Sequence, residues 1–195
     1  DAYSDHGHNH VGEKRGMENH PYLGFNYRIS ELHAAVALAQ TRKVPALKEK
    51  NRHHKKFMQD ILAKNPNISF AKLGDESGDS ATFLNILLPD TATTQRAVDE
   101  MNAAGVVGFD YWFNNMYHFI NQWDHLKNLT TVSKLPAEVF ERSQDYNKLD
   151  LPKTQAVIGR LISFGVKYKW TEGDMKTLAA KISAWVDKAV KPVNV

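Results

Sequence analysis

Two polar side chains, Asn26 and Arg28, stand immediately before a run of residues typical of a helix. The stretch is GFNYRISELHAAVALAQ, residues 24–40, and it passes from a loop into an alanine-rich helix. Backbone N–H groups at a helix start have no partner within the helix, and the helix dipole favours anions there. An amide and a guanidinium at this position can therefore bind a phosphate or a carboxylate. The alternative is a solvated loop with an ordinary helix cap.

Three histidines, His6, His8 and His10, alternate in the segment DHGHNH. In an extended segment they lie on one face, and three imidazoles can bind zinc. Zinc ligands are usually held by rigid neighbouring elements, whereas this segment contains glycine and lies near a chain end. We therefore expect no metal site, and we assign these histidines to packing or hydrogen bonding.

The most aromatic stretch is YWFNNMYHFINQWDH, residues 111–125. Rings at this density after a strand can line a pocket for a sugar or another planar ligand, with His118 as a polar contact. Aromatic clusters also form cores, and the chemistry alone favours packing. The sequence contains no GxGxxG, P-loop, GxSxG or HExxH motif, so no enzyme class follows from local motifs.

A long helical segment should connect the loop at residues 24–29 to the rest of the chain. Ser30 is a suitable N-cap, and apolar residues follow it at helical spacing. Pro45 interrupts the pattern, which predicts either one helix kinked at Pro45 or two helices joined there, over residues 30–65.

Beyond residue 65 the pattern changes to short β-type runs that alternate with helices, which predicts a small α/β domain over residues 66–195. One helix is expected at residues 91–104, ended by Gly105. The last helix should begin after Thr171 as N-cap and bury one side on the sheet. Four strands are expected, at residues 68–73, 82–89, 106–112 and 161–168.

The composition indicates a globular protein, with 42% hydrophobic and 24% charged residues in a chain of 195. The net charge is only +3, and the longest basic run, KEKNRHHKK, is expected on a helix surface, so nucleic-acid binding is not indicated. There is no cysteine, no membrane-length apolar run and no signal-peptide pattern. We expect a soluble cytoplasmic protein. Because the chain opens on Asp1 without a methionine, we also expect the C-terminal portion of a longer polypeptide.

The helix-start stretch closely resembles the pattern G-[YF]-N-x-R-[MIL]-x-E-[LI]-x-A-A-x-x-x-x-Q of the DegT/DnrJ/StrS family of pyridoxal phosphate (PLP)-dependent sugar aminotransferases. The DHG at residues 5–7 also matches the family. Residues 105–118 are similar to its segment G-I…H-Y…P-x-H. Tyr111 and Trp112 fall at its His-Tyr pair, and His118 falls within one position of its histidine, although asparagines stand where prolines are usual.

The resemblance implies a fold type I enzyme, whose large PLP-binding domain lies mostly upstream of this chain. Residues 1–29 would belong to the large-domain and dimer interface, and residues 66–195 would form the small C-terminal α/β domain, with a mainly antiparallel sheet. Asn26 would reach across a homodimer interface to the PLP phosphate of the neighbouring subunit, and Arg28 would lie near the anionic group of the substrate. The same resemblance implies a substrate-binding role for Tyr111, Trp112 and His118.

The activity implied is transfer of an amino group, from L-glutamate, to a keto or aldehyde sugar. The lysine that binds PLP covalently is expected upstream of the DHG segment, outside this chain. Dehydratases of the same family carry histidine in its place, so they remain an alternative, as does a binding or dimerisation module without catalysis. Residues 5–16 and 24–40 also resemble members of the family that act on an acidic lipopolysaccharide sugar, which implies 8-oxo-3-deoxy-manno-octulosonate as the substrate. Four cations would suit it: Arg28, Arg160, Lys167 and Lys169.

Overall fold

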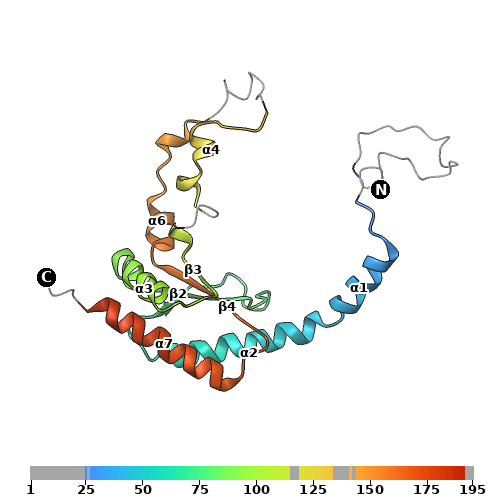
Figure 1. Ribbon diagram of the computed structural model, residues 1–195, viewed down its shortest axis with the longest axis horizontal. Coiled ribbons are helices and arrows are strands. Elements are labelled where there is room, and N and C mark those ends of the chain that lie inside the picture. Colours follow the sequence, from blue (N-terminus) through green and yellow to red (C-terminus); the bar gives the residue numbers. More distant parts are fainter. Residues whose placement is uncertain (1–24, 26, 115–118, 134–140, 142–143, 192–195) are drawn as a thin grey trace. The chain divides into compact units, whose positions relative to one another are not determined.

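The computed structural model describes residues 25, 27–114, 119–133, 141 and 144–191 (Figure 1). The chain divides into two compact units, Asp1–Ala46 and Leu47–Val195. None of the described helices is both long enough and apolar enough to span a membrane.

In the first unit, helix α1 (Glu31–Thr41) begins at the predicted N-cap. Ser30 Oγ accepts a hydrogen bond from the backbone N–H of His33, at 3.3 Å. All eleven residues of α1 are described, and none of them is buried. Helix α2 starts separately, so the structure has two helices here, with Pro45 in the first turn of the second. Proline is tolerated there because a first-turn N–H has no partner within the helix.

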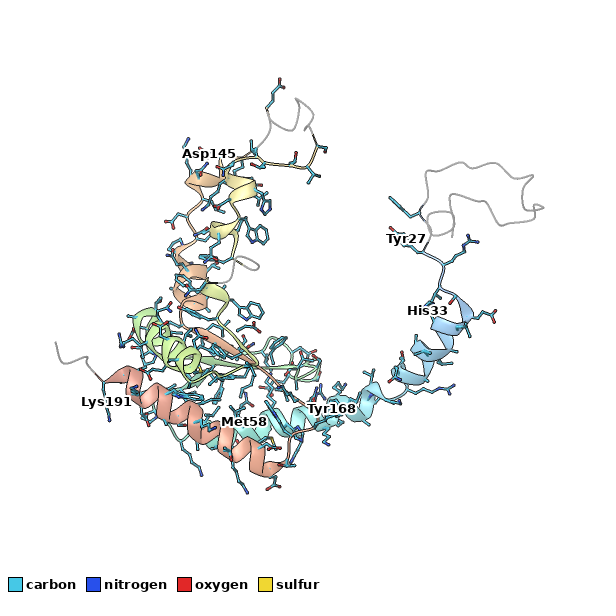
Figure 2. The ribbon with its side chains drawn as sticks, viewed as in Figure 1. Tyr27, His33, Met58, Asp145, Tyr168 and Lys191 are labelled. Atoms are coloured by element: carbon cyan, nitrogen blue, oxygen red, sulfur yellow. The ribbon has the colours of Figure 1, made fainter. Side chains whose placement is uncertain are left out.

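Helix α2 (Val44–Leu62) continues into the second unit and contributes Met58, which is labelled in Figure 2 and fully buried. Its basic run is not wholly on the surface, contrary to the expectation from sequence. His54 and Lys55 are 4% and 8% exposed. The reason is that each has a long-range partner: His54 Nδ1 lies 3.1 Å from the carbonyl oxygen of Lys167, and Lys55 pairs with Asp79.

The described residues of the second unit form a four-stranded sheet in the order β1-β2-β4-β3. All three neighbouring pairs are antiparallel, which confirms the mixed α/β fold expected from sequence. The edge strands are shorter than expected, and β3 starts only after Gly108, whose φ of 86° interrupts the extended backbone. The strands are β1 (Ser69–Phe70), β2 (Phe83–Leu87), β3 (Phe109–Asp110) and β4 (Leu161–Gly165).

Helices α3 (Thr91–Ala103) and α7 (Glu172–Val190) pack against each other (Figure 1) and share a core with one face of the sheet. Both predicted helix ends are confirmed. Gly105, with φ 68°, follows α3, and the N–H of Val106 donates to the carbonyl of Met101 at 3.0 Å. Thr171 caps α7 in a reciprocal capping box with Asp174. The core side chains from the sheet and α7 are Leu84, Ile86, Ile162, Phe164, Met175, Ala179, Ile182 and Val186.

Between β3 and β4 the chain forms short helices that the sequence pattern did not indicate. The longest of those that the structure describes is α6 (Pro152–Ile158), which has proline in its first turn and leads directly into β4. The other described ones are η2 (Trp112–Asn114), η3 (Ile120–Gln122), α4 (Asp124–Lys127) and η4 (Tyr146–Lys148).

Candidate functional site

The predicted anion-binding loop lies directly before α1. Asn26 lies outside the described residues, and Arg28 is exposed. Its neighbours Phe25 and Tyr27 are 62% and 71% exposed, and their ring centroids lie 5.7 Å apart. Figure 2 labels Tyr27 in this loop and His33 in the first turn of α1. The loop therefore presents a guanidinium beside a helix start, where the helix dipole favours an anion.

Tyr111, one of the predicted substrate-binding residues, lies in the core of the second unit. It is 7% exposed, and its hydroxyl donates to the carbonyl of Gly159 at 2.8 Å. Burial, and then the charge of Asp99, raises the pKa of Tyr111 to about 12. The hydroxyl is therefore neutral at ordinary pH, and a backbone acceptor holds it in place.

Trp112 lies at the start of η2, next to β4, and is partly exposed. Its indole Nε1–H donates to Ser163 Oγ at 2.7 Å. Ser163 Oγ in turn donates to Asn85 Oδ1, also at 2.7 Å. These two hydrogen bonds fix the indole over the middle of the sheet.

Of the other described aromatic residues in the stretch 111–125, some are packed in the interior and some lie at the surface. Phe113 and Phe119 stack with ring centroids 5.7 Å apart, and Phe119 is 4% exposed. Trp123 stacks on the imidazole of His125 at 5.9 Å. His118 lies outside the described residues. Packing thus accounts for Tyr111, Phe113 and Phe119, whereas Trp112 keeps an exposed portion.

Two of the four cations suggested for an acidic sugar, Arg160 and Lys169, have local contacts in the second unit. Arg160 Nε donates to the carbonyl of Leu88 at 2.6 Å, next to the end of β2. Lys169 Nζ lies 5.8 Å from the ring centroid of Tyr168. Arg160 therefore has a structural role, and Lys169 contributes a surface contact.

Two polar residues of the sheet, Asn85 and Ser163, belong to none of the sequence motifs described above. Each occupies a strand position between buried apolar neighbours, on the face opposite the core. That alternation is visible in FLNIL and LISFG, but the two residues meet only through the pairing of β2 with β4. Sequence alone would have shown two polar strand residues, without their contact.

Comparison with known proteins places the chain in a family. Residues 1–183 match the DegT/DnrJ/EryC1/StrS aminotransferase family. Among similar solved structures, an aminotransferase from Psychrobacter cryohalolentis has 17% sequence identity and a TM-score of 0.70, over 97% of this chain and 48% of that one. PseC from Helicobacter pylori, involved in the biosynthesis of pseudoaminic acid, has 15% identity and a TM-score of 0.65, over 96% of this chain and 45% of that one.

A putative sugar aminotransferase from Streptococcus pneumoniae, Spr1654 in its PLP form, has 13% identity and a TM-score of 0.66. The match covers 97% of this chain and 43% of that one. The present chain thus spans less than half the length of these relatives, and at such identities they show the likeness of the fold. Since the family match extends over nearly the whole sequence, this chain belongs to the DegT/DnrJ/EryC1/StrS aminotransferase family.

Proposed function

We propose that this chain is the C-terminal part of a PLP-dependent aminotransferase that transfers an amino group from L-glutamate to a keto or aldehyde sugar. The observation that carries the proposal is the family match over residues 1–183. Two similar solved structures support it, since one is described as a putative sugar aminotransferase in its PLP form and another as an aminotransferase of pseudoaminic acid biosynthesis.

The described part of the loop before α1 suits an anionic group. Arg28 is exposed beside the N-terminus of an eleven-residue helix, where both the guanidinium and the helix dipole favour an anion. Asn26 would hold the phosphate of the neighbouring subunit's PLP, and Arg28 would orient the anionic group of the substrate. When bound, PLP supplies the electron sink for amino transfer. The lysine that carries it is proposed to lie upstream of residue 1.

The sugar would meet the second unit at Trp112 and His118. An indole face packs well against the apolar face of a sugar ring, and an imidazole can hydrogen-bond its hydroxyls. Tyr111 would support this site from the core, where its hydroxyl is bound to Gly159. The finer proposal for the sugar is 8-oxo-3-deoxy-manno-octulosonate, an acidic lipopolysaccharide sugar, which Arg28 would suit as a counter-ion.

The partner surface is proposed to include α1. Three large apolar side chains on it, Leu32, Val36 and Leu38, are 82%, 62% and 54% exposed. Apolar exposure of this extent marks an interaction surface. We propose that a homodimer and the upstream large domain cover it, with active sites shared between subunits, and that the enzyme acts in the cytoplasm.

The test is an absorbance spectrum of the purified protein with its natural upstream segment, before and after addition of L-glutamate. A transaminase will show the visible band of bound pyridoxal phosphate, and L-glutamate will replace it with the shorter-wavelength band of pyridoxamine phosphate. A pyridoxamine-like band that never gives way to the visible band would favour the dehydratase alternative. Absence of cofactor absorbance would favour the non-catalytic module.

A further inference from the structure

Three polar side chains form a row across the sheet, on the face opposite the core. The register pairs Asn85 of β2 with Ser163 of β4, and Ser163 with Asp110 of β3. Directly paired residues point to the same face, so the three side chains follow one another across neighbouring strands. Their strand neighbours Ile86 and Ile162 point the other way and are fully buried.

The hydrogen bonds of Trp112 determine how this row is oriented. An indole N–H can only donate, so Ser163 Oγ accepts from Trp112 and must direct its own proton to Asn85. The atom of Asn85 that meets Ser163 is therefore its oxygen, and its NH₂ group points elsewhere. Among the described residues, no acceptor bonds this NH₂ group and no side chain donates to the Asp110 carboxylate.

An aromatic wall stands beside this row. Phe83 is 42% exposed, and its ring meets the Trp112 indole edge to face, with centroids 6.4 Å apart.

The combination selects one class of ligand. Aromatic faces pack against the C–H face of a sugar ring, an amide NH₂ donates to hydroxyl oxygens, and a carboxylate accepts from hydroxyl groups. A phosphate would be repelled by Asp110, whereas a ring with several neutral hydroxyl groups satisfies both the donor and the acceptor.

We propose that this sheet face is a carbohydrate subsite, in which Trp112 packs on the sugar ring while Asn85 and Asp110 bind its hydroxyl groups. Ser163, 2% exposed, is a positioning residue that holds both the indole and the amide. The inference rests on the proposed function for the statement that this sugar is the amino acceptor. The subsite itself rests on the geometry of the sheet.

The experiment uses the full-length protein and tryptophan fluorescence during titration with free monosaccharides: hexoses, N-acetylhexosamines and 3-deoxy-manno-octulosonate. At least one should change the emission saturably, and Trp112→Phe should abolish the change. Asn85→Asp keeps an oxygen that accepts from Ser163, removes the donor and adds a negative charge, so it should weaken binding at least tenfold, as should Asp110→Asn. Ser69→Ala is the matched control, because Ser69 lies on edge strand β1 and, among the described residues, its hydroxyl bonds only the carbonyl of Leu87.

The role of Ser163 has a separate readout. Ser163→Ala should shift the emission of Trp112 in the absence of sugar, because the indole loses its acceptor, and Ser163→Thr should restore it. Melting temperatures of all variants show whether a loss of binding is a loss of folding. The proposal is overturned if no sugar changes the emission, or if folded Asn85→Asp and Asp110→Asn proteins bind as the parent does.

Failure of the subsite and failure of the proposed function give different results. Conversion of bound cofactor by L-glutamate involves no sugar, so measuring it in the parent and in Ser69→Ala tests the proposed function without the subsite. A protein that binds sugar but does not react with L-glutamate keeps the subsite and contradicts the aminotransferase. A protein that reacts with L-glutamate but binds sugar independently of Asn85 and Asp110 contradicts the subsite and leaves the aminotransferase proposal standing.

Discussion

The hydroxyl of Tyr111 donates to the carbonyl of Gly159 at 2.8 Å, and this contact joins the end of β3 to the residue that follows α6. The two residues are 48 positions apart. The segment between them carries most of the aromatic stretch, so its two ends are fastened by one buried hydrogen bond.

Replacement of Tyr111 by phenylalanine should destabilise the second unit by about 1–3 kcal/mol, because it leaves a buried carbonyl without its donor while it preserves the ring. Chemical denaturation of the purified protein measures the change. Tyr146→Phe, at a partly exposed tyrosine in η4, is the matched control. Equal stability of the Tyr111→Phe variant and the parent would mean that water replaces the lost donor.

Tyr111 also predicts how the stability of the fold changes at alkaline pH. Burial and the charge of Asp99 raise the pKa of Tyr111 from 10.0 to about 12, so between these values the folded protein keeps a proton that the unfolded chain has released. Its contribution is complete below pH 10 and is lost as the pH rises towards 12, at up to about 1.4 kcal/mol per pH unit. Stability profiles of the parent and Tyr111→Phe should therefore converge over this window, and parallel profiles would contradict the shift.

Local signals predicted the helix ends, because a cap depends on side chains within a few residues. Ser30, Gly105 and Thr171 are each found where the sequence placed them. The strand order could not be read in this way, since β2 meets β4 across more than seventy residues. Tyr111 illustrates the same limit at the site: its residue type suits a pocket and a core equally, and its burial depends on a distant carbonyl.

Lys55 and Asp79 form a largely buried ion pair. Removing the charge of Asp79 should reduce the stability of the fold more than removing the charge of Lys55. Nζ and Oδ2 lie 2.7 Å apart, with side chains 10% and 22% exposed. Asp79→Asn keeps an oxygen for the N–H of Ala81, at 3.0 Å in the parent, but leaves the lysine buried without its counter-ion. We expect a loss of about 2 kcal/mol, between the values of exposed and fully buried pairs. Lys55→Met should cost less, and the double variant should be closest to the parent.

The change of folding stability at acid pH tests the contribution of the Lys55–Asp79 pair. Burial acts to raise the pKa of Asp79, but the hydrogen bond from Lys55, together with the other contacts, outweighs it and lowers the pKa below 3.8. The pair therefore stabilises the fold above that value, and the contribution is lost as the pH falls below it. A parent and an Asp79→Asn variant that differ equally at pH 3 and pH 7 would refute this account.

Gly105→Ala should destabilise the unit by about 1 kcal/mol, although no atom lies within 4 Å of the added methyl group. The cost comes from the backbone, because φ is 68° and a Cβ disfavours the left-handed region. Gly105→Asn is the control, since asparagine adopts this region more readily, and it should recover part of the loss. An alanine variant as stable as the parent would mean that the turn after α3 has relaxed.

The loop before α1 carries the prediction closest to function. Asn26→Ala in the full-length protein should weaken PLP retention by about 1–3 kcal/mol, the size of a hydrogen bond to a charged group. The measurement is cofactor loss on dialysis, read by absorbance. Arg28→Lys is the comparison: it keeps the positive charge but not the bidentate geometry, so it should alter sugar KM more than cofactor affinity. Cofactor affinity unchanged in Asn26→Ala would remove Asn26 from the phosphate site, while leaving the family assignment and the sugar subsite as they are.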